Sequence, residues 1–231
     1  TNKYVIEIGS NSSGSSIGIP ENLSTNLFVN HGWHGAVFEL EETECSKMTN
    51  FFALNFMTKN FHIEKEDINS YYSPLIVSGE VNVNNIDVKL RDINVPVEPD
   101  LFVIDIDGGD FDIIKKMDTV KPRVLVVAFE KRFRDRYAVI QKNRNDFSRN
   151  WAQSGTSSLL AWVLMLTEKN YTLCGVCSAG FNAFFIRNDC MDGKINPIKP
   201  KSVFDFHPIF SNMDEDFWLD PDETWESYPQ K

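Results

Sequence analysis

Acidic side chains gather in the run "IDID" at residues 104–107. Asp105 and Asp107 are two residues apart, so on a strand they would share one face, with side-chain bases about 7 Å apart. Two carboxylates this close repel each other unless a cation, a proton or a hydrogen-bond donor lies between them. Because Mg²⁺ prefers oxygen ligands, we expect a metal set of Asp107, Asp110 and Glu130. Alternatively, one Asp caps the next helix and the other accepts hydrogen bonds from backbone amides.

A glycine-containing turn follows the first apolar run of the chain. Its Gly9 and Gly14 do not form the G-x-G-x-x-G pattern, and the turn has no lysine of the kind a phosphate loop needs, which disfavours NAD and ATP. Glu39 ends the next apolar run, where a carboxylate can accept hydrogen bonds from both hydroxyls of a ribose. A carboxylate there repels phosphate, so we expect a nucleoside that is unphosphorylated at that ribose. The alternative is that Glu39 is simply a solvated acid at the end of a strand.

Basic residues follow Glu130 in the run "KRFRDR". Lys131, Arg132 and Arg134 would suit an anionic substrate if this loop lies at the ligand edge of the sheet. The alternatives are a solvated loop or a loop that balances the acidic C-terminal tail.

The composition describes one globular domain with a charged tail. The 231 residues carry a net charge of −10, and eight acidic residues without any Lys or Arg lie between Ser202 and Gln230. This balance argues against a nucleic-acid partner, because phosphate binding depends on clustered basic residues. The longest apolar run, Leu159–Leu166, has eight residues, so we expect no membrane partner, since a membrane span needs about 20. We expect a cytosolic protein with four reduced cysteines.

The apolar runs predict alternating strands and helices, which favours a parallel sheet with helices on its faces. The third strand is ambiguous, and we prefer residues 75–78 over the run "FHIE" at residues 61–64. The predicted strands are residues 4–8, 35–40, 75–78, 100–107, 123–130, 171–177 and 182–187. The predicted helices are residues 21–32, 43–57, 110–118 and 156–170. Only "SAGF" separates the last two strands, so one of them should run antiparallel at the sheet edge.

The chain resembles class I S-adenosylmethionine-dependent methyltransferases, and within them the FkbM-like group. Five segments carry the resemblance: "YVIEIGSN", "STNLFVNHGWHGAVFEL", "VNNIDVKLRDINVPVEPDLFVIDIDGGDF", "PRVLVVAFE" and "GTSSLLAWVLMLTEKNYTLCGVCSAGFNAFFIRND". The resemblance implies an α/β fold: a Rossmann-like, seven-stranded, mostly parallel sheet with a final antiparallel hairpin and helices on both faces. We expect the methyltransferase domain at residues 1–200. The composition adds a basic insertion at 131–155 near the active-site edge and an acidic, aromatic tail at 201–231.

The resemblance also implies roles for individual residues. Asp105 would lie beside the methionine moiety of S-adenosylmethionine, and Asp107 would face the transferred methyl group. The paired acids, independently of the resemblance, lead us to expect that Asp107 and Glu130 are catalytic, with Mg²⁺ between them activating a hydroxyl. Ser78, or Asp67 if the third strand lies elsewhere, would flank the adenine. The cofactor loop and the ribose acceptor would comprise Glu7, Gly9, Ser10, Asn11 and Glu39.

The expected activity is O-methylation of a hydroxyl on a sugar or secondary metabolite, so the partner would be a small-molecule or glycan acceptor. The family reads E-Y-N after strand five, whereas this chain has Glu130, Lys131 and Arg132. One rival function is a metal-dependent glycosyltransferase, because "DID" also satisfies the D-x-D pattern. A second is a non-catalytic scaffold. The tail interleaves aromatic and acidic residues, so we expect it either to cover the site or to form a homo-oligomer contact.

Overall fold

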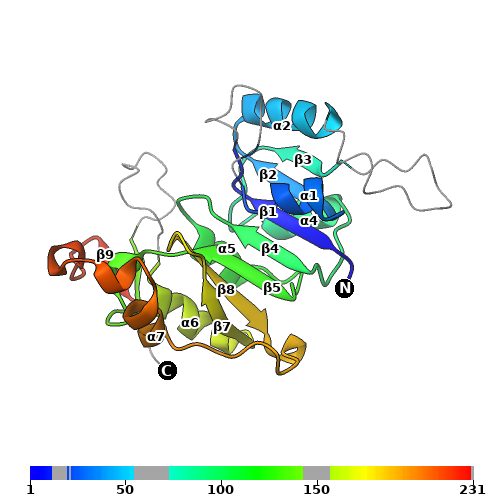
Figure 1. The fold of residues 1–231 in the computed structure, drawn as a ribbon. Coiled ribbons are helices and arrows are strands. Elements are labelled where there is room, and N and C mark those ends of the chain that lie inside the picture. Colours follow the sequence, from blue (N-terminus) through cyan, green and yellow to red (C-terminus); the bar gives the residue numbers. More distant parts are fainter. Residues whose placement is uncertain (12–19, 21, 55–72, 143–156, 230–231) are drawn as a thin grey trace. The chain divides into compact units, whose positions relative to one another are not determined.

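The computed structural model describes residues 1–11, 20, 22–54, 73–142 and 157–229. The chain forms two compact units (Figure 1). The N-terminal unit contains Thr1–Ile104 and Asp118–Pro122, and the C-terminal unit contains Asp105–Met117 and Arg123–Lys231. We describe each unit by itself.

Four parallel strands form the sheet of the N-terminal unit, in the order β3-β2-β1-β4. They are β1 (Tyr4–Ile8), β2 (His34–Glu39), β3 (Leu75–Ser78) and β4 (Leu101–Ile104). β1 and β2 are buried over almost their whole length, which explains why they read as continuous apolar runs. A Cβ at Gly35 would lie 1.8 Å from the backbone oxygen of Val5, so β1 and β2 can pair only with glycine at this position.

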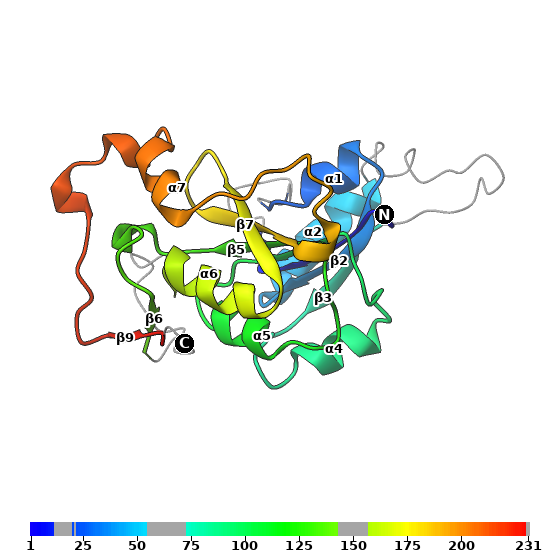
Figure 2. The same ribbon diagram turned by 90° about the horizontal axis from the view of Figure 1, so that it is seen from below.

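Helices cover both faces of this sheet. They are α1 (Thr25–Asn30), α2 (Glu42–Leu54) and α4 (Ile86–Asp92). α1 and α2 bury one face in a cluster of Val5, Phe28, Val37, Met48 and Phe52. α4 lies on the other side of the sheet from α1 (Figure 2). The helices therefore leave the ends of the strands as the places where polar side chains can act.

The C-terminal unit is built on three antiparallel strands. β8 (Asn182–Arg187) pairs with both β5 (Val124–Ala128) and β7 (Tyr171–Val176). Trp162 of α6 (Leu159–Glu168) is fully buried, and its Nε1 donates to the backbone oxygen of Ala128 at 2.9 Å. Phe111 of α5 (Asp110–Lys116) packs on the Trp162 ring with centroids 5.0 Å apart. These rings tie both helices to the end of β5.

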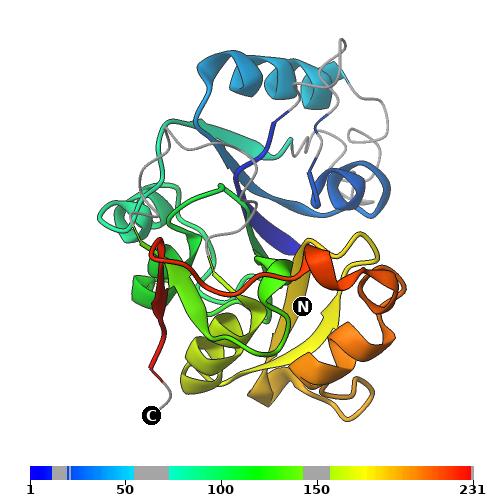
Figure 3. The same cartoon turned by 90° about the vertical axis from the view of Figure 1, so that its left-hand side faces the viewer.

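The C-terminal tail packs on its own unit. It contains α7 (Pro200–Phe206) and β9 (Trp225–Ser227), and β9 pairs antiparallel with β6 (Val139–Gln141) (Figure 3). Trp225 packs in a small core with Phe133 and Val139. Three short 3-10 helices lie in or near the tail, at Asn188–Cys190, Phe210–Asn212 and Glu215–Phe217, and a fourth, Lys131–Phe133, follows β5.

The complete strand order is β3-β2-β1-β4-β5-β8-β7, with a final antiparallel hairpin. This is the predicted α/β fold, and the predicted strands at 4–8, 75–78 and 182–187 are confirmed to the residue. The strand predicted at 100–107 is too long, because β4 ends at Ile104. The run at 61–64 lies outside the described residues. No helix among the described residues combines the length and the apolar character that a membrane crossing requires.

Candidate functional site

The ends of β1, β2 and β3 lie side by side in the N-terminal unit. The backbone N–H of Gly9, which has a φ of 85°, donates to the oxygen of Phe38 at 3.0 Å. The N–H of Gly79 donates to the oxygen of Glu39 at 2.9 Å. Glu39 is paired in register with Ser78, which is exposed. The parallel register thus brings together residues that the sequence places far apart, as predicted for the carboxyl ends of parallel strands.

Glu39 is the carboxylate at this edge. Its Oε2 accepts a hydrogen bond from the backbone N–H of Ser10 at 3.2 Å, and its Oε1 accepts one from the N–H of Glu41 at 2.9 Å. A carboxylate has about four acceptor positions, so two further donors can bind. Glu39 is half-buried, and burial raises the pKa of its carboxyl. The arrangement suits a ligand that presents two adjacent hydroxyls.

Glu7 does not point into the glycine-containing turn but binds the backbone of the segment before α1. Its two carboxylate oxygens accept hydrogen bonds from the N–H groups of Leu23 and Ser24, each at 3.0 Å. The side chain is buried, and the resulting loss of water raises its pKa to about 7 although these hydrogen bonds oppose the shift. Glu7 therefore anchors the segment before α1 to β1.

Ser10 and Asn11 complete the predicted cofactor loop. The side chain of Ser10 is buried: its hydroxyl donates to Met48 Sδ at 3.4 Å and accepts from Asn22. Only the backbone of Ser10 therefore contacts Glu39. Asn11 is exposed, and Asp67, the alternative adenine-flanking residue, lies outside the described residues.

A tight turn carries the acidic run of the C-terminal unit. Asp105 and Asp107 follow the end of β4, so the same-face spacing expected for a strand does not apply to them. Asp107 is exposed with a φ of 57°, and the protein around it reduces hydration enough to raise the pKa of its carboxyl. Asp110 is buried and its Oδ1 accepts the N–H of Ile106 at 2.9 Å, which fixes the turn. Burial raises the pKa of Asp110 to about 6, and the charge of Asp107 adds to the effect.

Glu130 forms an ion pair with Arg132, two residues further along the chain. The Glu130 carboxylate, only 1% exposed, accepts hydrogen bonds from Arg132 Nε at 2.9 Å, from Nη2 at 2.6 Å and from the backbone N–H at 2.9 Å. The described part of the chain contains no group of three His, Cys, Asp or Glu side chains arranged to hold a metal ion. The expected metal set of Asp107, Asp110 and Glu130 is therefore not brought together.

The other two basic residues of the predicted substrate set have aromatic partners. Lys131 Nζ lies 3.7 Å from the centroid of the Phe181 ring, and the guanidinium of Arg134 lies 4.0 Å from that of Trp218. Arg134 also approaches Glu215 at 3.5 Å. Loss of water lowers the pKa of Lys131.

No protein-family model matches the sequence, and no curated protein matches it. The chain is similar to solved methyltransferases. A SAM-dependent methyltransferase of Methanosarcina mazei is 12% identical, with a TM-score of 0.41; the match covers 79% of this chain and 90% of that one. An O-methyltransferase of Bacillus cereus, solved in complex with SAH, is 14% identical, with a TM-score of 0.42; the match covers 80% of this chain and 72% of that one.

Phe181 is not among the residues that the sequence singles out. It lies in the turn between β7 and β8 and leaves 48% of its surface exposed. The available signal was an aromatic residue in the short "SAGF" connection, where a turn favours small and polar residues instead.

Proposed function

We propose that the chain is an S-adenosylmethionine-dependent methyltransferase that methylates a hydroxyl group. The observation that supports this proposal most directly is the contact between the Glu39 carboxylate and the Ser10 N–H, which joins the end of β2 to the loop after β1. This pairing offers a carboxylate for a ribose diol beside a turn at Gly9, where backbone can approach a ligand closely.

The donors and acceptors at this edge fit an adenosyl group. Glu39 keeps acceptor capacity for two hydroxyls, and the turn lacks the lysine that a triphosphate would need. A carboxylate in this position also disfavours a phosphorylated ribose. Gly9, Ser10, Asn11 and Glu39 are the residues we assign to the cofactor, with Ser78 toward the adenine. The role of Asp105 beside the methionine part stays a prediction. Glu7 has a structural role in this proposal, because it binds the backbone of the segment before α1.

When bound, S-adenosylmethionine supplies a methyl group on a sulfonium sulfur, and transfer breaks the carbon–sulfur bond as a carbon–oxygen bond forms, leaving a neutral thioether. The protein's part is to align the acceptor oxygen and to take its proton. We assign that proton to Asp107, because its carboxylate is exposed to an incoming hydroxyl and its raised pKa makes it a stronger base. Glu130 plays a structural part in this proposal, because Arg132 occupies both of its oxygens.

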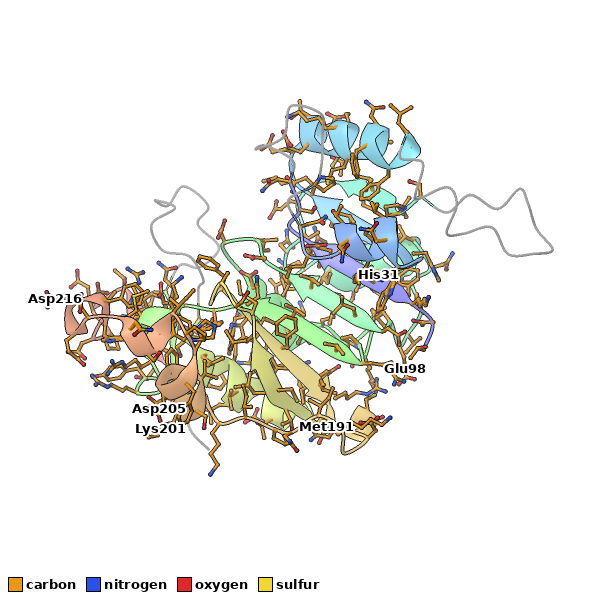
Figure 4. All side chains as sticks on the ribbon, in the orientation of Figure 1. His31, Glu98, Met191, Lys201, Asp205 and Asp216 are labelled. Atoms are coloured by element: carbon orange, nitrogen blue, oxygen red, sulfur yellow. The ribbon has the colours of Figure 1, made fainter. Side chains whose placement is uncertain are left out.

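The first test is titration calorimetry with S-adenosylmethionine and S-adenosylhomocysteine, each with and without Mg²⁺. We expect micromolar binding that Glu39→Ala removes. Glu98→Ala is the matched control, since Glu98 precedes β4 and so stands toward the opposite ends of the parallel strands (Figure 4). If S-adenosylmethionine bound only in the presence of Mg²⁺, the proposed site would have to include the metal ion.

Two outcomes would replace the proposal with a rival. Heat with uridine diphosphate and Mn²⁺, together with none for S-adenosylmethionine, would favour a glycosyltransferase that uses Asp105 and Asp107. No heat with any nucleoside would favour a scaffold.

The assignment of Asp107 has its own test. Asp107→Asn should abolish methyl transfer to an acceptor found by screening with labelled cofactor, while binding of S-adenosylhomocysteine stays within about twofold of the original. Asp112→Asn, in the first turn of α5, serves as the control. Unchanged turnover in Asp107→Asn would remove Asp107 from the mechanism.

A further inference from the structure

The three basic residues of the predicted substrate set, Lys131, Arg132 and Arg134, differ in the groups that already neutralise their charge. Arg132 is paired with Glu130 through both guanidinium and backbone donors. Arg134 lies on Trp218 and approaches Glu215. Lys131 is half-buried, and within the described residues its ammonium group has an aromatic ring but no carboxylate at ion-pair distance. Lys131 is therefore the residue of this set that retains positive charge for a ligand.

Phe181 is held in place by backbone rather than by core packing. Its carbonyl oxygen accepts the N–H of Phe129 at 3.1 Å, which fixes the β7–β8 turn against the end of β5. Its own N–H and that of Asn182 point at Cys177 Sγ, at 3.4 Å and 3.3 Å. The turn is thus fixed on both sides, yet the ring is 48% exposed. A fixed aromatic ring with half its surface in water offers a flat apolar contact at low entropic cost.

Lys131 and Phe181 come from different elements and meet at the carboxyl ends of β5 and β7, where ligands bind in α/β sheets. The Glu130–Arg132 pair brackets Lys131 in the chain and holds the short 3-10 turn that contains it. This pair is therefore a positioning device for the lysine.

We propose that Lys131 and Phe181 form a subsite for the methyl acceptor, and that the acceptor carries an anionic group beside a flat apolar ring. The ammonium group binds the anion and the exposed part of the ring stacks on the ligand. The identification of the ligand as the methyl acceptor rests on the proposed function. The subsite itself consists of residues of the C-terminal unit alone.

The test uses three probes observed by saturation-transfer NMR: benzoate, which has both features, benzamide, which lacks the charge, and acetate, which lacks the ring. We expect benzoate to bind at millimolar concentration and the other two to bind more weakly. Lys131→Met and Phe181→Leu should each weaken benzoate binding by about fivefold or more.

Matched controls come from α7. Lys201→Met removes an exposed lysine that is paired with Asp205 at 2.9 Å (Figure 4), and Phe206→Leu changes a phenylalanine that is 79% exposed. Both should leave benzoate binding unchanged.

Equal binding of benzoate to the original protein and to both subsite variants would overturn the proposal, as would equal binding of benzoate and benzamide or no binding of benzoate at all. Calorimetry with S-adenosylhomocysteine on the same samples separates the two claims. Cofactor binding without benzoate binding refutes the subsite alone, whereas benzoate binding without cofactor binding keeps the anion site and refutes its role in methyl transfer.

Discussion

At the scale of single residues, Glu7 is a buried carboxyl whose protonation is coupled to folding. Loss of water on burial raises its pKa from an ordinary value of 4.5 to about 7 in the folded protein. The folded state therefore holds the proton more tightly, so the stabilisation from Glu7 is complete below pH 4.5 and is lost as pH rises through about 7. We expect Glu7→Gln to remove this pH dependence from the free energy of unfolding.

Urea unfolding of both proteins between pH 5 and pH 8 measures the effect. The difference in unfolding free energy between them should change with a slope approaching about 1.4 kcal/mol per pH unit between the two pKa values and should level off above about pH 7. Parallel pH profiles for the two proteins would show that Glu7 ionises normally.

The Glu130–Arg132 pair supplies a second prediction. Arg132→Met leaves the Glu130 carboxylate buried without its partner, which should cost about 3 kcal/mol in the free energy of unfolding. Arg134→Met is the control, because Glu215 is exposed and loses little when its partner is removed. Urea midpoints of the two variants should differ clearly, and equal midpoints would contradict the assignment of Glu130 to a structural role.

The candidate site was predictable from sequence where it depends on register alone. Glu39 and the turn at Gly9 meet because parallel strands end at one edge, and the apolar runs mark those ends. The pairing of Glu130 with Arg132 was not predictable, because the carboxylate meets the backbone N–H of Arg132 as well as its guanidinium only where the chain turns into the 3-10 helix Lys131–Phe133.

At the scale of elements, the approach of β1 to β2 depends on one glycine. Gly35→Ala would place a methyl group 1.8 Å from the oxygen of Val5, so the strands would have to separate. We expect a loss of about 3 kcal/mol or more, or failure to fold. In Gly175→Ala the added Cβ would lie 3.8 Å from Phe184 Cδ2, an ordinary contact, so this variant should fold with nearly unchanged stability. Circular dichroism during thermal unfolding compares the stability of the two variants. An unchanged unfolding temperature in Gly35→Ala would mean that β1 and β2 do not approach each other as closely as described.

The sequence did not predict elements that depend on distant partners or that carry too short an apolar pattern. β6 has only three residues and pairs with β9, which lies more than eighty residues further along the chain. No local apolar period marks such a strand, so the segment at 131–155 looked like a polar insertion. α4 carries only Ile86 and Leu90 as buried residues on seven positions, too short a pattern to predict a helix. The strand predicted at 100–107 was too long because its alternation of Ile and Asp continues past Ile104 into the turn.

At the scale of the whole molecule, the acidic tail belongs to the core of the C-terminal unit. Trp225 is 7% exposed and its ring lies 4.6 Å from that of Phe133, while Tyr228 packs against Phe111 at 5.2 Å. A tail that held only a partner subunit would leave these rings exposed in a single chain. The homo-oligomer contact stays a prediction, which sedimentation velocity of the full chain tests directly.

Trp225→Ala should therefore act on folding rather than on association. Removing a buried indole costs about 3 to 5 kcal/mol, because the space left beside Phe133 and Val139 cannot close fully. Phe206→Ala, on the exposed side of α7, should cost almost nothing. Urea unfolding measures the free energy of unfolding of both variants. It is followed by far-ultraviolet circular dichroism, so that the signal does not depend on the removed tryptophan. If Trp225→Ala instead kept its midpoint and changed only the sedimentation coefficient, the tail would be an interface between copies of the chain.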